Sequence, residues 1–182
     1  MTELGPILLI LARNAIATRL HQPVNATVDT QNLHKTAATF VTLTQNGQLR
    51  GCIGTLEAWR PLITDVQENA CSAAFSDPRF KPLQRDEFDK TRVEVSLLTP
   101  AEPLHFEDEA DALRQLRPLT DGIIFTAGRH RSTFLPQVWE QLPDPASFLA
   151  QLKQKAGLPA GYWGPNVQLE RYTVEKWKEA AP

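Results

Sequence analysis

A β-hairpin in residues 38–55 constrains the fold of this chain more than any other feature of its sequence. Within residues 38–44, Phe40, Thr42 and Thr44 alternate with Val41 and Leu43, and the dipeptide Asn46-Gly47 follows soon after. Asn-Gly is a strong signal for the two-residue turn of a hairpin. The run LRGCIGT, Leu49 to Thr55, is then the second strand. Because a two-residue turn joins antiparallel strands, the pattern predicts an antiparallel sheet.

The second predicted strand carries the candidate site. Side chains alternate between the two faces of a strand. One face would therefore carry Leu49, Gly51, Ile53 and Thr55, and the other Arg50, Cys52 and Gly54. We expect Leu49 and Ile53 to face the core. The opposite face then presents a cation, a thiol and a gap left by glycine.

Helical periodicity and helix-breaking residues place the other elements. The apolar spacing predicts helices over residues 4–20, 61–74, 108–116 and 145–156, and a turn followed by a helix over 134–142. Strands are expected over 93–97, 122–126 and 167–174, and a loop over 22–35. A hairpin with helices between groups of strands predicts an α+β fold, with a mostly antiparallel sheet and flanking helices. The 182 residues suit one sizeable core.

Charge and composition exclude several classes of protein. The formal charge of −2, without a long run of one sign, argues against nucleic-acid binding by bulk phosphate attraction. The chain has no apolar run long enough to span a bilayer, and its start lacks the positive charge of a signal peptide. Two cysteines do not form a disulfide framework, so we expect reduced thiols in a cytoplasmic protein. The histidine and cysteine spacings predict neither a metal site nor a bound cofactor.

Five stretches together resemble the AMMECR domain family, which in bacteria supplies the A component of the AmmeMemoRadiSam system: FVTLTQNGQLRGCIGTLE, ENACSAAFSDPRF, VEVSLL, DGIIFTAGRHRSTFLPQVWEQL and FLAQLKQKAGL. The resemblance runs from about Phe40 to the C-terminus. It implies one α+β domain, residues 1–182, with a larger and a smaller lobe and a cleft near residues 49–57. It also implies a Memo-type protein and a radical S-adenosylmethionine protein as partners, but it names no reaction.

Cys52 has three interpretations: a nucleophile, a redox thiol, or a small apolar filler, which is the default for a lone cysteine. Arg50 on the same face would favour the thiolate, which keeps a catalytic role open. Arg50 itself would bind an anion or form a cross-strand ion pair with Glu94. In the catalytic alternative, Glu94 would act as an acid or base.

The neighbours of Cys52 have a functional and a structural interpretation. Gly51 and Gly54 would leave clearance either for a ligand or for a helix that packs across the strand. Thr55 would contact the same ligand, or would be only a good strand former.

Two further segments contain candidate anion-binding groups. Arg79 would bind an anion together with Asp77, or the two residues would brace their loop against each other, which we favour slightly. His130 and Arg131 lie in the stretch Gly128 to Thr133, which has the character of an anion-binding turn. The alternative for this stretch is a solvated hairpin loop.

Two classes of function remain. In the first, the chain is an enzyme or an enzyme component with a small anionic metabolite in its site. Arg50 would orient that metabolite, and Cys52 would be a nucleophile or a polar wall. In the second, the chain is a non-catalytic binding or scaffold module of the same multi-protein system. The polar, cationic face beside a buried apolar face favours a small-ligand site. Neither the reaction nor the oligomeric state follows from the sequence.

Overall fold

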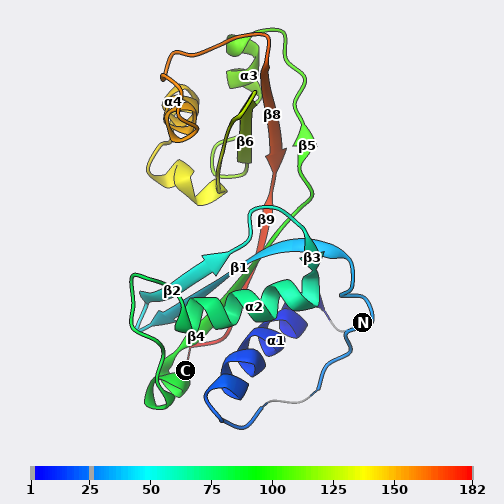
Figure 1. The fold of residues 1–182 in the computed structure, drawn as a ribbon, viewed down its shortest axis with the longest axis vertical. Helices are drawn as coiled ribbons and strands as arrows, with labels where there is room; N and C mark the ends of the chain where they lie inside the picture. Colours follow the sequence, from blue (N-terminus) through cyan, green and yellow to red (C-terminus); the bar gives the residue numbers. More distant parts are fainter. Residues whose placement is uncertain (1–2, 25–26, 182) are drawn as a thin grey trace. The chain divides into compact units, whose positions relative to one another are not determined.

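The chain folds into two units (Figure 1). The computed structural model describes residues 3–24 and 27–181. Unit 1 comprises Met1–Leu98 and Glu175–Pro182, and unit 2 comprises Thr99–Val174. The chain therefore leaves unit 1, completes unit 2, and then returns to unit 1 with its last strand.

The predicted hairpin is confirmed and forms part of the sheet of unit 1. The strands of this sheet are β1 (Thr36–Gln45), β2 (Gln48–Gly54), β3 (Arg60–Pro61), β4 (Arg92–Leu98) and β9 (Val174–Lys178). Their order is β2-β1-β4-β9, and β3 pairs with β1. Asn46 and Gly47 both have positive φ, 50° and 76°. This conformation suits the twist of the hairpin and explains why asparagine and glycine stand there.

Two helices cover one face of this sheet, α1 (Leu4–Arg19) and α2 (Leu62–Phe75), and Figure 1 shows them side by side. Their apolar stripes pack with alternate residues of β1 and β4, such as Val41 and Val95, to form the core of unit 1. The short 3-10 helix η1 (Arg85–Lys90) precedes β4. Its Phe88 joins the same core.

A network around Arg13 ties the returning chain to the rest of unit 1. Arg13 on α1 forms two bonds with the Glu179 carboxylate, of 2.5 Å from Nε and 2.7 Å from Nη2. Nη2 also donates to the carbonyl oxygen of Thr91 at 2.5 Å. The backbone N–H of Glu179 donates to the carbonyl of Val93 at 2.9 Å. The last strand is thus held by the first helix and by β4.

Unit 2 has its own antiparallel sheet and its own core. Its elements are β5 (Glu102–Pro103), α3 (Glu109–Gln115), β6 (Gly122–Ala127), β7 (His130–Phe134), the 3-10 helix η2 (Pro136–Glu140), α4 (Pro145–Lys155) and β8 (Val167–Tyr172). The strand order is β5-β8-β6-β7. Trp139 stacks on Phe148 at 3.8 Å between ring centroids, and its indole N–H donates to the carbonyl oxygen of Asp121 at 2.7 Å.

The predicted α+β class is confirmed, and the four predicted helices occur within one or two residues of their expected ends. Two expectations need correction. The helix over 134–142 is only the short η2, and the strand over 167–174 ends at Tyr172, after which β9 begins. Within the described part of the chain, no helix has the length and apolar character needed to cross a membrane.

Candidate functional site

A β-bulge at Arg50 changes the geometry of the LRGCIGT strand. β1 pairs Leu43 with Gly51 and Thr44 with Leu49, so Arg50 is skipped. A bulge adds one unpaired residue and interrupts the alternation of side chains. The prediction that Leu49 faces the core is therefore wrong, because its side chain lies beyond the bulge and is 43% exposed. Ile53, on the other side of the bulge, packs against the core as expected.

Arg50 forms a two-pronged ion pair with η1. Its Nε and Nη2 donate to the two carboxylate oxygens of Glu87 at 3.0 and 3.1 Å. These hydrogen bonds lower the pKa of Glu87. The third nitrogen, Nη1, is buried and has no hydrogen-bond partner in the described residues. The predicted ion pair with Glu94 is wrong, because β1 lies between β2 and β4, and Glu94 instead pairs with Lys178 at 3.1 Å.

Cys52 lies in a row of polar side chains that crosses three strands. Thr42 of β1 is paired with Cys52 on one side and with Glu94 on the other, so the three residues share one face of the sheet. The Sγ atom of Cys52 is 3.3 Å from Oγ1 of Thr42. Glu94 stands two strand spacings away, about 10 Å between backbones. The catalytic roles of Cys52 and Glu94 stay predictions.

The loop after α2 caps the outer edge of β2. Asp77 is buried and accepts hydrogen bonds from the backbone N–H of Cys52 at 2.9 Å and from Nη2 of Arg79 at 2.8 Å. Nη2 of Arg79 also donates to the carbonyl oxygen of Cys52 at 3.4 Å. The predicted bracing of Asp77 by Arg79 is thus present. The hydrogen bonds from Arg79, together with the one from Cys52, hold the pKa of Asp77 well below its usual range.

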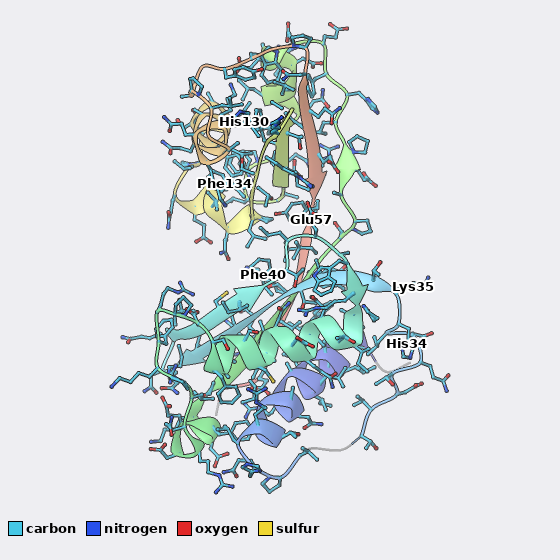
Figure 2. All side chains as sticks on the ribbon, viewed as in Figure 1. His34, Lys35, Phe40, Glu57, His130 and Phe134 are labelled. Atoms are coloured by element: carbon cyan, nitrogen blue, oxygen red, sulfur yellow. The ribbon has the colours of Figure 1, made fainter. Side chains whose placement is uncertain are left out.

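The two glycines beside Cys52 are explained by packing within unit 1. A Cβ atom on Gly51 would overlap the carbonyl oxygen of Ala73 in α2, so β2 approaches this helix closely. A Cβ atom on Gly54 would overlap the ring of Phe40, which Figure 2 labels on β1. The clearance left by each glycine is filled by the protein itself.

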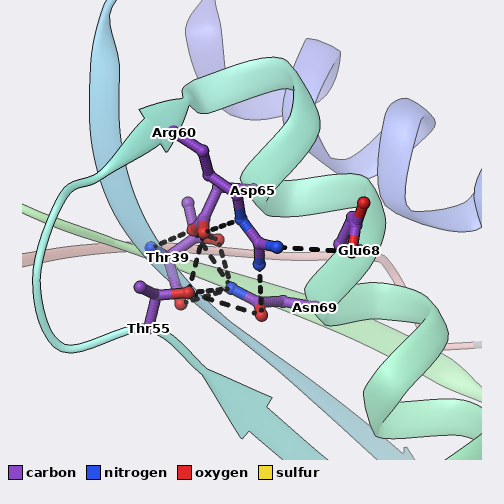
Figure 3. Close-up of polar contacts among 6 residues, drawn as sticks. All are labelled: Thr39, Thr55, Arg60, Asp65, Glu68 and Asn69. Atoms are coloured by element: carbon purple, nitrogen blue, oxygen red, sulfur yellow. Dashed lines mark hydrogen bonds and ion pairs between the residues drawn. The ribbon is translucent and has the colours of Figure 1, made fainter.

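A buried polar network begins where β2 ends, and it includes Thr55 (Figure 3). Its centre is the fully buried carboxylate of Asp65 in α2. Oδ1 accepts from Oγ1 of Thr55 and from Nε of Arg60, both at 2.7 Å. Oδ2 accepts from the backbone N–H and the hydroxyl of Thr39 at 2.8 and 2.6 Å, and from Nδ2 of Asn69 at 3.1 Å. Thr55 therefore has a structural role in this network.

The sequence analysis missed Asp65, although a signal was present. Asp65 and Asn69 are four residues apart, beside Leu62 and Val66 in the apolar stripe of the predicted helix. A carboxylate inside an apolar stripe is buried with partners or it is destabilising. The position of Asp65 within the apolar stripe was therefore enough to predict a buried polar network around its carboxylate.

His130 and Arg131 belong to unit 2, where they occupy β7. The predicted turn over residues 128–133 is too long. The turn is limited to Gly128, with φ of +61°, and Arg129, and pairing with β6 makes the rest a strand. Figure 2 shows His130 and Phe134 at the two ends of this strand. Nδ1 of His130 lies 2.9 Å from the carbonyl oxygen of Ala156. Their role in ligand binding stays a prediction.

Six residues of unit 1 form one charged cluster, here called the Arg50–Arg79 cluster: Arg50, Cys52, Asp77, Arg79, Phe80 and Glu87. The guanidinium carbons of Arg50 and Arg79 lie 5.9 and 5.4 Å from the centroid of the same Phe80 ring. Each guanidinium is paired with one carboxylate, so the cluster is close to neutral. Residues 3–24 and 27–181 contain no group of three or more His, Cys, Asp or Glu side chains arranged to hold a metal ion.

Comparisons with known proteins cover most of the chain. The sequence model of the AMMECR1 family matches residues 9–177. A protein of Methanothermobacter thermautotrophicus is 43% identical over 142 residues, which are 77% of this chain and 74% of that protein. Protein MK0488 of Methanopyrus kandleri is 34% identical over 187 residues, 99% of this chain and 90% of that protein. The crystal structure of the uncharacterized protein PH0010 from Pyrococcus horikoshii aligns with a TM-score of 0.79 and 33% identity, covering 98% of this chain and 92% of that one.

Proposed function

This chain belongs to the AMMECR1 family, and from that premise we propose that it binds a small anion at the Arg50–Arg79 cluster. The observation that carries the proposal is Nη1 of Arg50, a buried nitrogen without a hydrogen-bond partner in the described residues. A buried charged donor without an acceptor is costly, and in folded proteins such groups commonly meet a water molecule or an ion. An anion oxygen at Nη1 would supply the missing acceptor.

The surroundings of Nη1 suit a small and weakly held anion. Glu87 fixes the guanidinium of Arg50 in one orientation, so the N–H groups of Nη1 already have a fixed direction before an anion binds. The side chain of Arg79 is 55% exposed, with its guanidinium carbon 5.4 Å from the centroid of the Phe80 ring, and it supplies a second cation. Cys52 would form part of the polar wall of the site. We assign no reaction to its thiol.

A titration with inorganic phosphate tests this proposal. We expect phosphate to shift the backbone amide NMR signals of residues 50–54 and of Asp77, Arg79 and Phe80. Arg50→Lys keeps the charge but loses the planar, fixed Nη1 donor, so it should weaken binding about tenfold or more. Arg114→Lys is the matched control, because Arg114 is an exposed arginine of unit 2. The proposal fails if phosphate, acetate and bicarbonate all leave these signals unchanged, or if Arg50→Lys binds as the parent does.

We also propose that the chain works in the cytoplasm with a Memo-type protein and a radical S-adenosylmethionine protein. Family membership supports this proposal. Co-purification of the three proteins from one expression host tests it, and we expect the untagged pair to be retained by this chain. Their loss in a mild wash would overturn the partner proposal and leave the anion site standing.

A non-catalytic protein-binding or scaffold role is the alternative, and the loop between β2 and β3 favours it. Leu56 and Trp59 are large apolar residues of this loop, and they are 42% and 68% exposed. Thr55 and Arg60 at its two ends are fixed to Asp65, so the loop is held in place. Trp59→Ala separates the two roles. It should abolish partner capture in a scaffold, and it should leave phosphate binding unchanged if the anion site is the function.

A further inference from the structure

Unit 2 contains a cavity that the proposed function does not use. Its volume is about 560 Å³, inside the range of about 300–1,000 Å³ typical of small-molecule sites. Two segments line it, residues 104–107 after β5, and residues 163–165 together with Val167 at the start of β8. The side chains along it combine aromatic rings with one carboxylate and one imidazole. This composition limits the kind of ligand that would be recognised.

Two aromatic rings form the fixed wall of this cavity. Phe106 and Trp163 are half-buried against the core of unit 2, with ring centroids 5.4 Å apart and ring planes tilted by 55°. Lys153 supports Trp163 from within, with its Nζ atom 5.4 Å from the ring centroid. Lys153 is itself 1% exposed and paired with Glu109 at 2.6 Å. The indole is therefore placed before any ligand arrives.

The free charge at the cavity is negative. The side chain of Glu107 is exposed, and it has no hydrogen-bond or ion-pair partner in the part of the chain that the structure describes. Its backbone is fixed, because its N–H donates to Asp111 at 3.0 Å, and the preceding His105 carbonyl accepts from Gln115 at 2.8 Å. The positive charge of Lys153 is neutralised by its carboxylate partner and is buried. A ligand thus meets aromatic faces beside one unpaired carboxylate.

We infer that this cavity binds a small organic cation of the quaternary or methylated ammonium type. The negative faces of aromatic rings attract a cation, and Trp gives the strongest attraction of the aromatic side chains. The methyl groups of such a cation bury apolar surface against Phe106 and Trp163, and Glu107 complements its charge. A primary ammonium ion of the same charge is more strongly hydrated and has fewer apolar groups to bury. The inference stands on unit 2 alone and is independent of the anion site in unit 1.

Titration of the whole chain with tetramethylammonium chloride tests the inference. We expect shifts of the amide NMR signals of residues 104–107, 163, 164 and 167, with a parallel change in tryptophan fluorescence. tert-Butanol, a neutral molecule of similar size, should bind about fivefold more weakly or worse. Sodium chloride at the same concentration corrects for ionic strength.

Three variants locate the site. Trp163→Leu should weaken tetramethylammonium binding about 5- to 30-fold, and Trp163→Phe should retain most of it because an aromatic face remains. Glu107→Gln should weaken tetramethylammonium binding about two- to fivefold, as expected for an exposed charge. The matched control is Glu102→Gln, which removes another exposed carboxylate, on β5, and should leave this binding unchanged. The inference is overturned if tert-butanol binds as well as tetramethylammonium, or if tetramethylammonium moves none of these signals. Equal binding by Trp163→Leu and the parent would also overturn it.

Discussion

Replacement of Asp65 by asparagine should destabilise unit 1 by an amount that the geometry of its network predicts. Asparagine keeps the size of the side chain but exchanges one acceptor oxygen for an NH₂ donor. If the NH₂ group takes the place of Oδ1, it faces Nε–H of Arg60. If it takes the place of Oδ2, it faces the N–H of Thr39 and the amide of Asn69. Both orientations place donor against donor in a buried site.

The magnitude follows from what is left unpaired. A buried donor without an acceptor costs about 1–3 kcal/mol, and removal of one partner of a buried charge pair costs about 3–5 kcal/mol. Arg60 is 15% exposed and, among the residues that the structure describes, keeps only Glu68 as an ionic partner, at 3.3 Å. We therefore expect Asp65→Asn to lower the free energy of unfolding of unit 1 by about 3–5 kcal/mol.

Hydrogen exchange of the amides in α2 and β1, together with urea unfolding, measures this loss in unit 1 separately from unit 2. Glu68→Gln is the matched control, because it removes a 62% exposed carboxylate from the same arginine. Its effect should stay within about 1 kcal/mol. A loss for Asp65→Asn within about 1 kcal/mol of this control would refute the reasoning.

Three further results are expected. The pKa of Asp77 is lowered in the folded protein, so its contribution to stability is complete above the unfolded pKa of the carboxyl, about 4, and is lost as the pH falls through the folded value. When urea unfolding midpoints are measured against pH, Asp77→Asn should therefore reduce the fall of the midpoint at acid pH. Burial raises the pKa of the Cys71 thiol, so its alkylation by iodoacetamide, followed by peptide mass spectrometry, should reach half its maximal rate above about pH 8.5; half-maximal alkylation near neutral pH would contradict this. Gly51→Ala should lower the free energy of unfolding in urea by about 1–3 kcal/mol, because the added methyl group overlaps the Ala73 carbonyl oxygen. The control Gly161→Ala, where the added methyl group meets open space, should change it by no more than about 0.5 kcal/mol. Equal losses for the two variants would show that the overlap is relieved without cost.

Local sequence patterns predicted most helices and strands, whereas the contacts of the candidate site depend on residues that are far apart in the sequence. The hairpin was predictable because alternation and the turn residues lie within one short stretch. The bulge at Arg50 was only hinted at, because glycines inside a strand, such as Gly51 and Gly54, often mark a bulge. They do not fix which residue is skipped, since that depends on how β1 and β2 align. Simple alternation put Arg50 on the face of Cys52, and Glu94 was suggested as its partner on the assumption that their strands are neighbours, but β1 lies between them.

The true partner of Arg50 could not be read from local sequence. Glu87 lies 37 residues further along the chain, in a short 3-10 helix that had not been predicted. Asp77 and Arg79 were easier, because residues two apart in one loop are near each other in every fold. The candidate site was therefore predictable in its residue types but not in its pairing.

The return of the chain to unit 1 has a consequence for synthesis on the ribosome. α1, β1, α2 and β4 emerge before unit 2, but β9 and Glu179 emerge only after it. At about 5–20 residues per second, β4 waits for several seconds as an open sheet edge. During that time Arg13 lacks its carboxylate partner. Nascent chains stalled within unit 2 should therefore expose a strand edge that the finished protein does not have, and they are the form of this protein most prone to mispairing and to capture by chaperones.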